Sequence, residues 1–311
     1  MKRLLGALPF LLCHIVALAA LFIEGSVLAW ILCFVLYAVR MWGVTAGYHR
    51  YFSHRAFKTG RGFQFALAWL AQSSAQKGVL WWAAHHRDHH KHSDSAEDVH
   101  SPVQHGFWHA HLGWLFEPKN QGTDMARVRD LARFPELRFL NRFHLLPPII
   151  LALICYAIDG LPGLIIGFFV STVLLWHGTF LINSMAHVFG RRRYATKDDS
   201  RNSALLAAIT LGEGWHNNHH RYAASAKNGF FKGEFDPTYL VLRGLERLGL
   251  VHSLRPVPER VLEEGRRADA IRTGAGANVA RIQSSMKMPQ SKPSPSMRRL
   301  EGVSEPSAST R

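Results

Sequence analysis

Cysteine is scarce in this chain, and none of it lies near the polar motifs. There are three cysteines among 311 residues, Cys13, Cys33 and Cys155, and each falls inside an apolar run. A free cysteine in such a run is most simply a small buried hydrophobe. The cysteines therefore predict neither disulfide bonds nor thiolate ligands for a metal.

Acidic residues are also few: the chain has 22 Asp and Glu residues compared with 37 Lys and Arg residues, and its formal net charge is +15. A basic chain can bind nucleic acid, but these basic residues lie beside apolar runs and form no nucleic-acid-binding motif. Anionic lipid headgroups, or an acyl carrier with phosphates such as coenzyme A, fit this charge better. The charge therefore predicts membrane lipids as partners and no nucleic acid.

Long apolar runs are present, and they come in two closely spaced pairs. They cover about residues 4–23, 27–44, 145–158 and 161–186. Runs of this length can cross a membrane as helices, and each pair predicts a hairpin. The short turns carry Glu24 and Asp159, whereas Lys and Arg gather in the long segments, which places both termini and the middle segment in the cytoplasm. The predicted fold is an all-α integral membrane protein with four transmembrane helices in two hairpins and a cytoplasmic helical cap.

The same pattern divides the chain into a membrane domain, 1–262, and a basic tail, 263–311, whose composition predicts disorder. The first apolar run resembles the core of a signal peptide, but its cleavage would leave an odd number of spans. The moderately apolar stretch 63–80 carries several Gln and Ser residues. It predicts a helix on the membrane surface or inside the cytoplasmic part, not a fifth span.

Histidine is abundant, with nineteen residues that are mostly clustered. Two segments repeat the pattern H-x-x-H-H, whose members are three and four residues apart and share one helix face. They contain His86, His89 and His90, and His216, His219 and His220. His49 and His54 are five apart, so they can bind one metal only if the helix ends or bends between them. Asn183 and His187 are four apart and share a face again.

These clusters predict a metal site, because so many imidazoles held together without a cation would lose solvation and gain nothing. Imidazole suits zinc, copper, iron and nickel, and the lack of cysteine and methionine in the clusters argues against copper(I) and zinc–thiolate sites. The number of histidines favours a dinuclear redox centre. Two Glu-x-x-His pairs, Glu97–His100 and Glu213–His216, suggest a carboxylate di-iron site as an alternative. That class needs further glutamates on partner helices, and the sequence has none beside its spans.

The isolated histidines are interpreted differently. Surface positions are predicted for His100, His105, His109, His144 and His252. His14 and His177 lie in predicted spans, where an ionisable group suggests function by default, but neutral imidazoles with hydrogen-bond partners are the simpler interpretation. A metal transporter is the alternative from another class, and it would place its ligands near the middle of the bilayer. The clusters flank the spans instead.

The clusters and their surroundings resemble the membrane-bound acyl-CoA desaturases of the stearoyl, or delta-9, type. The likeness extends over roughly residues 40–255 in the right order and spacing. It is carried by residues 43–55, Trp82, 86–90, 106–115, 183–187 and 212–220.

This resemblance implies two iron ions, with O₂ as co-substrate. One iron would be held by His49, His54, His86, His90 and His219. The other would be held by His89, His187, His216 and His220, with Asn183 contacting it through a water. The bend of an acyl tunnel would be shaped by Gln76, Trp82 and Thr179. His85 and His92 match no ligand position.

The resemblance also implies the reaction, in which a saturated long-chain acyl group becomes cis-monounsaturated. Only a strong oxidant made from metal and O₂ can cleave an unactivated C–H bond. The acyl group would arrive on coenzyme A or in a lipid, with electrons from a separate ferredoxin or cytochrome b5, because no heme or flavin domain is fused to the chain. Hydroxylation by the same ligands is the alternative within this superfamily. The motif around Glu213 looks bacterial, which implies an inner-membrane protein with a cytoplasmic active site.

Overall fold

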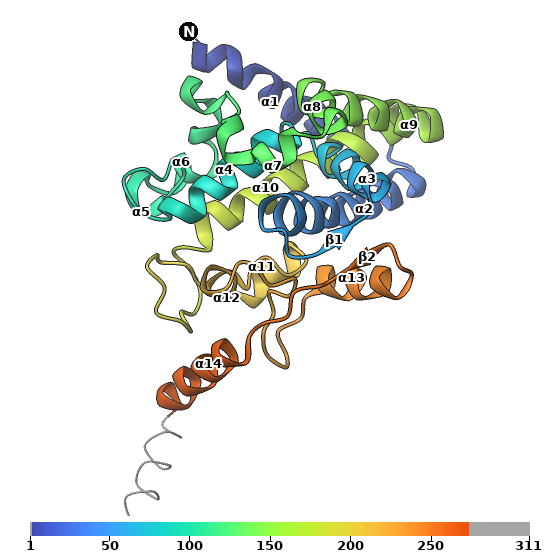
Figure 1. Ribbon diagram of the computed structural model, residues 1–311. Helices are drawn as coiled ribbons and strands as arrows, with labels where there is room; N and C mark the ends of the chain where they lie inside the picture. Colours follow the sequence, from blue (N-terminus) through green and yellow to red (C-terminus); the bar gives the residue numbers. More distant parts are fainter. Residues whose placement is uncertain (1, 274–311) are drawn as a thin grey trace, which may run out of the picture. The chain divides into compact units, whose positions relative to one another are not determined.

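The apolar runs form helices that pack against one another in the computed structural model, which describes residues 2–273. They are α1 (Lys2–Leu18), followed by the short η1 (Ala19–Leu21), α2 (Val27–Trp42), α9 (Leu146–Pro162), the π-helical η6 (Gly163–Val170) and α10 (Ser171–Met185). Both α1 and α2 pack against η6, and α2 also packs against α10 (Figure 1). The two halves of the sequence are thus joined through their apolar segments.

The backbone turns sharply where the sequence predicts the second hairpin turn. Asp159 (φ −145°, ψ 30°) and Gly160 (φ 55°, ψ −140°) leave the helical region, and glycine adopts positive φ at little cost. The hydroxyl of Ser26, in the first turn, donates a hydrogen bond to Asp159. The two predicted turns therefore lie together.

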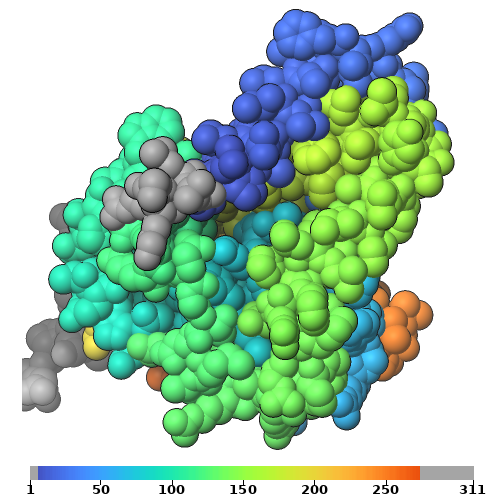
Figure 2. Space-filling view, turned by 90° about the horizontal axis from the view of Figure 1, so that it is seen from above, coloured from blue at the N-terminus to red at the C-terminus, as the bar shows by residue number. Residues whose placement is uncertain are grey.

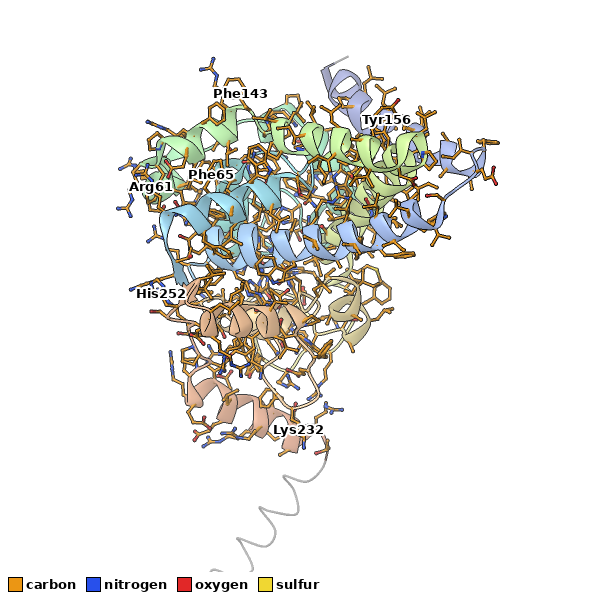
Figure 3. The ribbon with its side chains drawn as sticks, turned by 90° about the vertical axis from the view of Figure 1, so that its right-hand side faces the viewer. Arg61, Phe65, Phe143, Tyr156, Lys232 and His252 are labelled. Carbon is orange, nitrogen blue, oxygen red and sulfur yellow. The ribbon has the colours of Figure 1, made fainter. Side chains whose placement is uncertain are left out.

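Two helical stretches are long and apolar enough to cross a membrane, Val27–Ser53 and Leu146–Met185, and Gly6–Leu21 is apolar but shorter. Large apolar side chains on these stretches are exposed, among them Tyr156, which points outward in Figure 3. Exposed apolar side chains on long helices suit contact with lipid. The complete topology of four spans in two hairpins, with its cytoplasmic cap, stays a prediction.

The remaining segments are shorter. Between α2 and α9 lie the π-helical η2 (Gly43–Ser53), α3 (Arg61–Gln72), α4 (Val79–His92), α5 (Pro102–His105), α6 (Phe107–His111), η3 (Gly113–Phe116), η4 (Pro118–Asn120), η5 (Met125–Val128), α7 (Arg129–Ala132) and α8 (Pro135–Arg142). After α10 follow α11 (Ala204–Ile209), α12 (His216–Arg221), α13 (Pro237–Arg247) and α14 (Glu259–Arg272). Strands β1 (Lys58–Thr59) and β2 (Val251–His252) pair antiparallel, with Lys58 opposite His252. The fold is therefore mainly helical with one short ribbon, not entirely α.

The main hydrophobic core lies where η2, α3, α4 and α8 meet. Its fully buried side chains include Phe52, Leu67, Leu80 and Leu137, and burying one such side chain contributes about 1.5–3 kcal/mol. The stretch 63–80 is not one helix, because α3 ends at Gln72 and a loop precedes α4. This core holds η2 and α4, the two elements that carry the first two histidine clusters, in fixed relation.

The predicted tail begins inside a helix. The described residues up to Ala268 form one unit that ends within α14, and α14 extends through the predicted boundary at 263. Val261 of α14 is buried, and its carbonyl accepts a hydrogen bond from the Tyr194 hydroxyl. Residues 274–311, which make up most of the predicted tail, lie outside the described residues.

Candidate metal centre

The nine predicted ligand histidines come together in two groups. In each group one nitrogen of every ring lies within 4.8 Å of the others. The five-histidine group consists of His49, His54, His86, His90 and His219. The four-histidine group consists of His89, His187, His216 and His220. This is the division into five and four that the resemblance implies. The role of these residues as ligands and iron as the bound metal stay predictions.

Helices α4 and α12 each supply both groups. On α4, His86 and His90 are four residues apart and face the five-histidine group, while His89 faces the other. On α12, His219 belongs to the five-histidine group, and its neighbour His220 belongs to the four-histidine group. Two adjacent faces of one helix thus serve two neighbouring sites, as the H-x-x-H-H spacing requires.

A π-helix brings His49 and His54, which are five residues apart, to the same side of the chain. The segment η2 has the i to i+5 hydrogen bonds of a π-helix, and it ends where the amide of His54 donates to the carbonyl of His49 at 3.2 Å. The two rings then lie 4.8 Å apart, centroid to centroid. The wider helical turn brings them to one side without breaking the helix between them.

Within the groups, Nε2 atoms of different rings lie within hydrogen-bond distance of one another, but neutral rings have too few N–H groups to donate all of these bonds. Nε2 of His219 lies 3.0 Å from Nε2 of His49 and 2.9 Å from Nε2 of His90, but a neutral imidazole has only one N–H to give. Nε2 of His220 is buried and has no hydrogen-bond partner within residues 2–273. Two metal ligands at right angles, with bonds of about 2.1 Å, lie about 3 Å apart. The spacing therefore fits a shared cation.

Carboxylates contact the opposite, Nδ1 side of four of the rings. The pairs, from Nδ1 to the carboxylate oxygen, are His49–Glu213 at 2.6 Å, His89–Asp98 at 2.9 Å, His187–Asp94 at 2.7 Å and His220–Asp198 at 2.7 Å. A carboxylate in this position keeps the proton on Nδ1 and turns the Nε2 lone pair toward the centre of the group. Three of the four carboxylates serve the four-histidine group.

The surroundings keep most of these rings neutral, which is the form that binds a metal. Burial lowers the pKa of His220 to about 4, although Asp198 opposes the change. Burial, and then repulsion by neighbouring histidines, holds the pKa of His86 and His90 well below the usual value. Burial alone would raise the pKa of Asp94, but its hydrogen bond with His187, the charge of that ring, and the hydrogen bonds from Ser101 and Asp199 together outweigh burial and lower the pKa to about 2.

His100 is buried, and its predicted surface position is wrong. Its ring stacks on His89 at 4.5 Å and packs against Trp114 at 4.8 Å. Asp98 binds His89 and thereby draws the loop with His100 onto α4. Burial, followed by repulsion from His89, lowers the pKa of His100 to about 3. Of the other histidines predicted at the surface, His105 and His252 are exposed, and His109 and His144 are half-buried.

His14 and His177 have hydrogen-bond partners, as predicted, and with His111 they form a chain. The Phe10 carbonyl can only accept, so Nδ1 of His14 donates to it at 2.8 Å. Nε2 of His14 then accepts from His177 at 3.0 Å, and Nδ1 of His177 accepts from His111 at 3.0 Å. His111 ends the chain on the Ser184 hydroxyl at 2.9 Å. Because a neutral imidazole carries one N–H, the bond of His14 to the Phe10 carbonyl sets the direction of the hydrogen bonds between the three rings.

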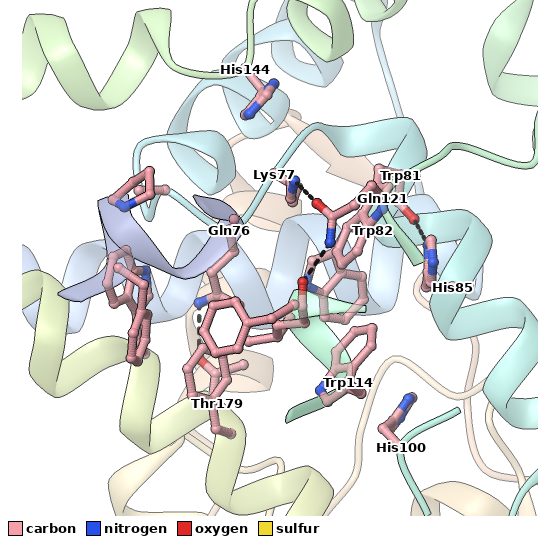
Figure 4. Close-up of a pocket in the computed structure, with 18 of the residues that line it drawn as sticks. Gln76, Lys77, Trp81, Trp82, His85, His100, Trp114, Gln121, His144 and Thr179 are labelled. Atoms are coloured by element: carbon pink, nitrogen blue, oxygen red, sulfur yellow. Dashed lines mark hydrogen bonds between the residues drawn. The ribbon is translucent and has the colours of Figure 1, made fainter. Parts of the chain in front are cut away.

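A cavity of about 310 Å³ opens beside the five-histidine group. Its wall includes His86, Asn183 and the three predicted tunnel residues. Gln76 donates to the Thr179 hydroxyl at 3.1 Å (Figure 4), and Trp82 stacks on His86 at 4.9 Å. Most of the remaining wall is apolar, and Figure 2 shows the surface hollowed between α1 and the green segments that lead into α9. The cavity thus connects the surface with the five-histidine group.

These features together define a class of protein. Two groups of convergent imidazoles can hold two metal ions, an apolar cavity ends at one of them, and long apolar helices lie alongside. Such an arrangement serves an enzyme that brings a long apolar substrate to a metal centre at a membrane.

Sequence comparison identifies the family: the chain belongs to the fatty acid desaturase family, whose sequence model matches residues 25–226. It is 36% identical to an sn-2 palmitoyl-lipid 9-desaturase of Nostoc sp. over 227 residues, 72% of this chain and 80% of the relative. It is also 36% identical to an acyl-CoA C20 Delta5-desaturase of Anemone leveillei over 233 residues, 74% of each chain. An sn-1 stearoyl-lipid 9-desaturase of Synechocystis sp. is 35% identical over 233 residues, 74% and 73% of the two chains. The protein is an oxidoreductase of lipid metabolism.

Proposed function

We propose that this protein uses O₂ and two irons to convert a saturated long-chain acyl group into a cis-monounsaturated one at the delta-9 position. The observation that carries the proposal is the convergence of nine imidazoles, in groups of five and four, beside a cavity that reaches His86. Desaturation at position 9 is further supported by the names of the Nostoc and Synechocystis relatives.

Each histidine group would hold one iron, and Asn183 would contact the iron of the four-histidine group through a water. When bound, the irons supply with O₂ and electrons an oxidant that can cleave an unactivated C–H bond. The role of the protein is orientation. The carboxylates on Nδ1 hold the rings in the metal-binding tautomer, and this support typically changes metal affinity or activity 10–100-fold.

The cavity would bind the acyl chain and exclude water from the reacting carbons. Gln76 and Thr179, joined by their hydrogen bond, would form one wall of a bend in this cavity, and Trp82, which stacks on His86, would form another. An apolar chain held at a fixed depth presents one pair of carbons to the metals. The position of the double bond thus follows from the distance between the bend and the two groups.

We further propose coenzyme A as the acyl carrier and a separate ferredoxin or cytochrome b5 as the electron donor, at the cytoplasmic face of a bacterial inner membrane. The basic charge beside the apolar helices supports a substrate with phosphates and the cytoplasmic side. A lipid-linked acyl group is the second candidate, because the Nostoc and Synechocystis relatives are named lipid desaturases.

Lipid analysis of expressing cells tests the reaction. We expect gas chromatography to show new monounsaturated acyl chains only when O₂ is present. His219→Ala should abolish them, whereas the matched change His252→Ala, at an exposed histidine outside both groups, should not. Full product formation by His219→Ala, or without O₂, would contradict the mechanism.

The acyl carrier is tested with purified protein in lipid vesicles together with an electron donor. Stearoyl-CoA and a phospholipid with saturated chains are offered in separate reactions, each with labelled acyl groups. Product from the coenzyme A ester alone supports the first candidate, and product from the phospholipid alone supports the second.

A further inference from the structure

The loop that carries Gln76 has a strained backbone. It joins α3 to α4, and Ala75 and Lys77, on either side of Gln76, have φ angles of 58° and 67°. A residue with a Cβ adopts such a left-handed angle only at a cost, and the strain persists where the surroundings fix the backbone. All three residues line the cavity, and Figure 4 shows Gln76 and Lys77 in its wall. Something outside the loop must therefore hold Gln76 in place.

Three side chains from other elements hold this loop by binding its carbonyl groups. They come from α2, η2 and α10. The bonds are Arg40 to the Ser73 carbonyl at 3.3 Å, Tyr48 to the Lys77 carbonyl at 2.7 Å, and Trp176 to the Ser74 carbonyl at 2.8 Å. The loop is thus fixed on both sides of Gln76.

Arg40 is the most unusual of the three, because it is fully buried in an apolar helix without a carboxylate partner among the residues that the structure describes. Its exposed fraction is 0%. Its other N–H groups donate to neutral oxygens, the Leu36 carbonyl at 3.1 Å and the hydroxyls of Ser171 at 2.5 Å and Thr172 at 2.8 Å. An unpaired buried charge is costly, and an ionisable group in an apolar span suggests function by default.

The guanidinium of Arg40 joins the two segments that carry Gln76 and Thr179. It binds the Thr172 hydroxyl, which lies two helical turns before Thr179 on α10, and the Ser73 carbonyl, three residues before Gln76. A planar fork with five donors can bridge such segments, which a lysine cannot do in the same way. The bonds of Arg40 and the hydrogen bond between Gln76 and Thr179, at 3.1 Å, thus join the same two segments of the chain.

We propose that Arg40, together with Tyr48 and Trp176, is a specificity-determining positioning residue that decides which carbons of the acyl chain are desaturated. Trp82 stacks on His86 and fixes the bend to the five-histidine group. The three hydrogen bonds to the loop fix the opposite wall. The inference rests on the proposed desaturase function, and it concerns the position of the double bond, not the ability to make one.

The test compares double-bond positions in the products of Arg40→Met, Tyr48→Phe and Trp176→Phe. The two Phe variants each remove one hydrogen bond and keep an aromatic ring. We expect the ratio of misplaced to main isomers to rise about tenfold in Arg40→Met, since small misplacements have large effects on reacting geometry. Smaller rises are expected in Tyr48→Phe and Trp176→Phe. Mass spectrometry of dimethyl disulfide adducts of the products locates the double bonds.

The matched control is Tyr194→Phe, which removes a hydroxyl that donates to the Val261 carbonyl of α14 at 3.0 Å, from a residue outside the cavity wall. Its isomer ratio should equal that of the unchanged protein. If all three variants give a lower yield with an unchanged isomer ratio, the positioning role of these residues is overturned, while the proposed desaturase function stands. If the unchanged protein makes no unsaturated product, the proposed function fails as well. The Phe variants keep the test decisive if Arg40→Met does not fold.

Discussion

The two histidine groups share α4 and α12 but differ in the charge that surrounds them. The five-histidine group has one carboxylate, Glu213, which Arg50 also binds at 3.0 Å. The four-histidine group has three, namely Asp94, Asp98 and Asp198. A carboxylate on Nδ1 makes an imidazole a better electron donor to a metal. The difference predicts that a metal would bind more tightly to the four-histidine group, which would also stabilise a higher charge on it.

The largest loss of metal affinity is expected when a carboxylate that contacts Nδ1 is removed from the four-histidine group. Asp98→Asn and Asp198→Asn should each lower its metal affinity 10–100-fold and leave about one metal per protein under a competing chelator. Metal content of the purified protein measures this. The control is Asp130→Asn, because Asp130 pairs with Arg87 and Arg55 and with no histidine of either group. Equal loss of both metals would contradict the comparison.

A smaller effect is expected from Glu213→Gln, since Glu213 orients one of five rings. We expect about a tenfold loss of affinity, confined to the five-histidine group. Mössbauer spectra of the iron-loaded protein distinguish the two sites during chelator titration. The comparison is wrong if Glu213→Gln empties the four-histidine group first.

Acid should destabilise the metal-free protein. The pKa of His220 is about 4 in the folded state and about 6.5 in an unfolded chain, so between these values the unfolded state binds more protons. Stability is therefore fully present above about pH 6.5 and falls as the pH drops toward 4. Melting temperatures in detergent at several pH values, with a chelator present, measure it. A stability that is constant or rises over this range would be inconsistent with a neutral, buried His220.

The smallest effect on the metal centre is expected from a change outside both groups. His177→Phe removes the middle ring of the chain that joins His14 to His111 and leaves partly buried nitrogens unpaired. We expect a loss of about 1–3 kcal/mol in unfolding free energy, with the metal content unchanged. Thermal melting and metal analysis of the same sample measure both quantities. Loss of metal would show that the hydrogen-bonded histidines His14, His177 and His111 support the metal centre.

Helical periodicity indicates that His86, His89 and His90 lie close together on one side of a helix, but it does not divide them between two groups; that division follows only from the resemblance to desaturases. The closeness of His49 and His54 depends on a π-helix that no periodicity indicates. The buried position of His100 follows from the contact between Asp98 and His89. Such contacts join a loop to a helix at no regular spacing, so the sequence alone could not reveal them.

The carboxylates around the four-histidine group were missed for the same reason. Asp94 and Asp98 follow the second cluster in a polar loop, and Asp198 lies in another loop near the third. In sequence they resemble solvent-exposed acids, and only the fold brings them to the rings. The membrane topology is a different case, because hydropathy predicts four runs and two of the described helical stretches satisfy the criteria of length and composition.

The placement of α12 has a consequence for how the protein is made. Both groups need this helix, because it supplies His219 to one and His216 and His220 to the other. During synthesis neither set of ligands is complete until the ribosome has passed residue 220 and that segment has left the exit tunnel. Both apolar pairs of helices precede it in the chain. The proposed metal loading therefore falls late in biogenesis, after the long apolar segments have been made.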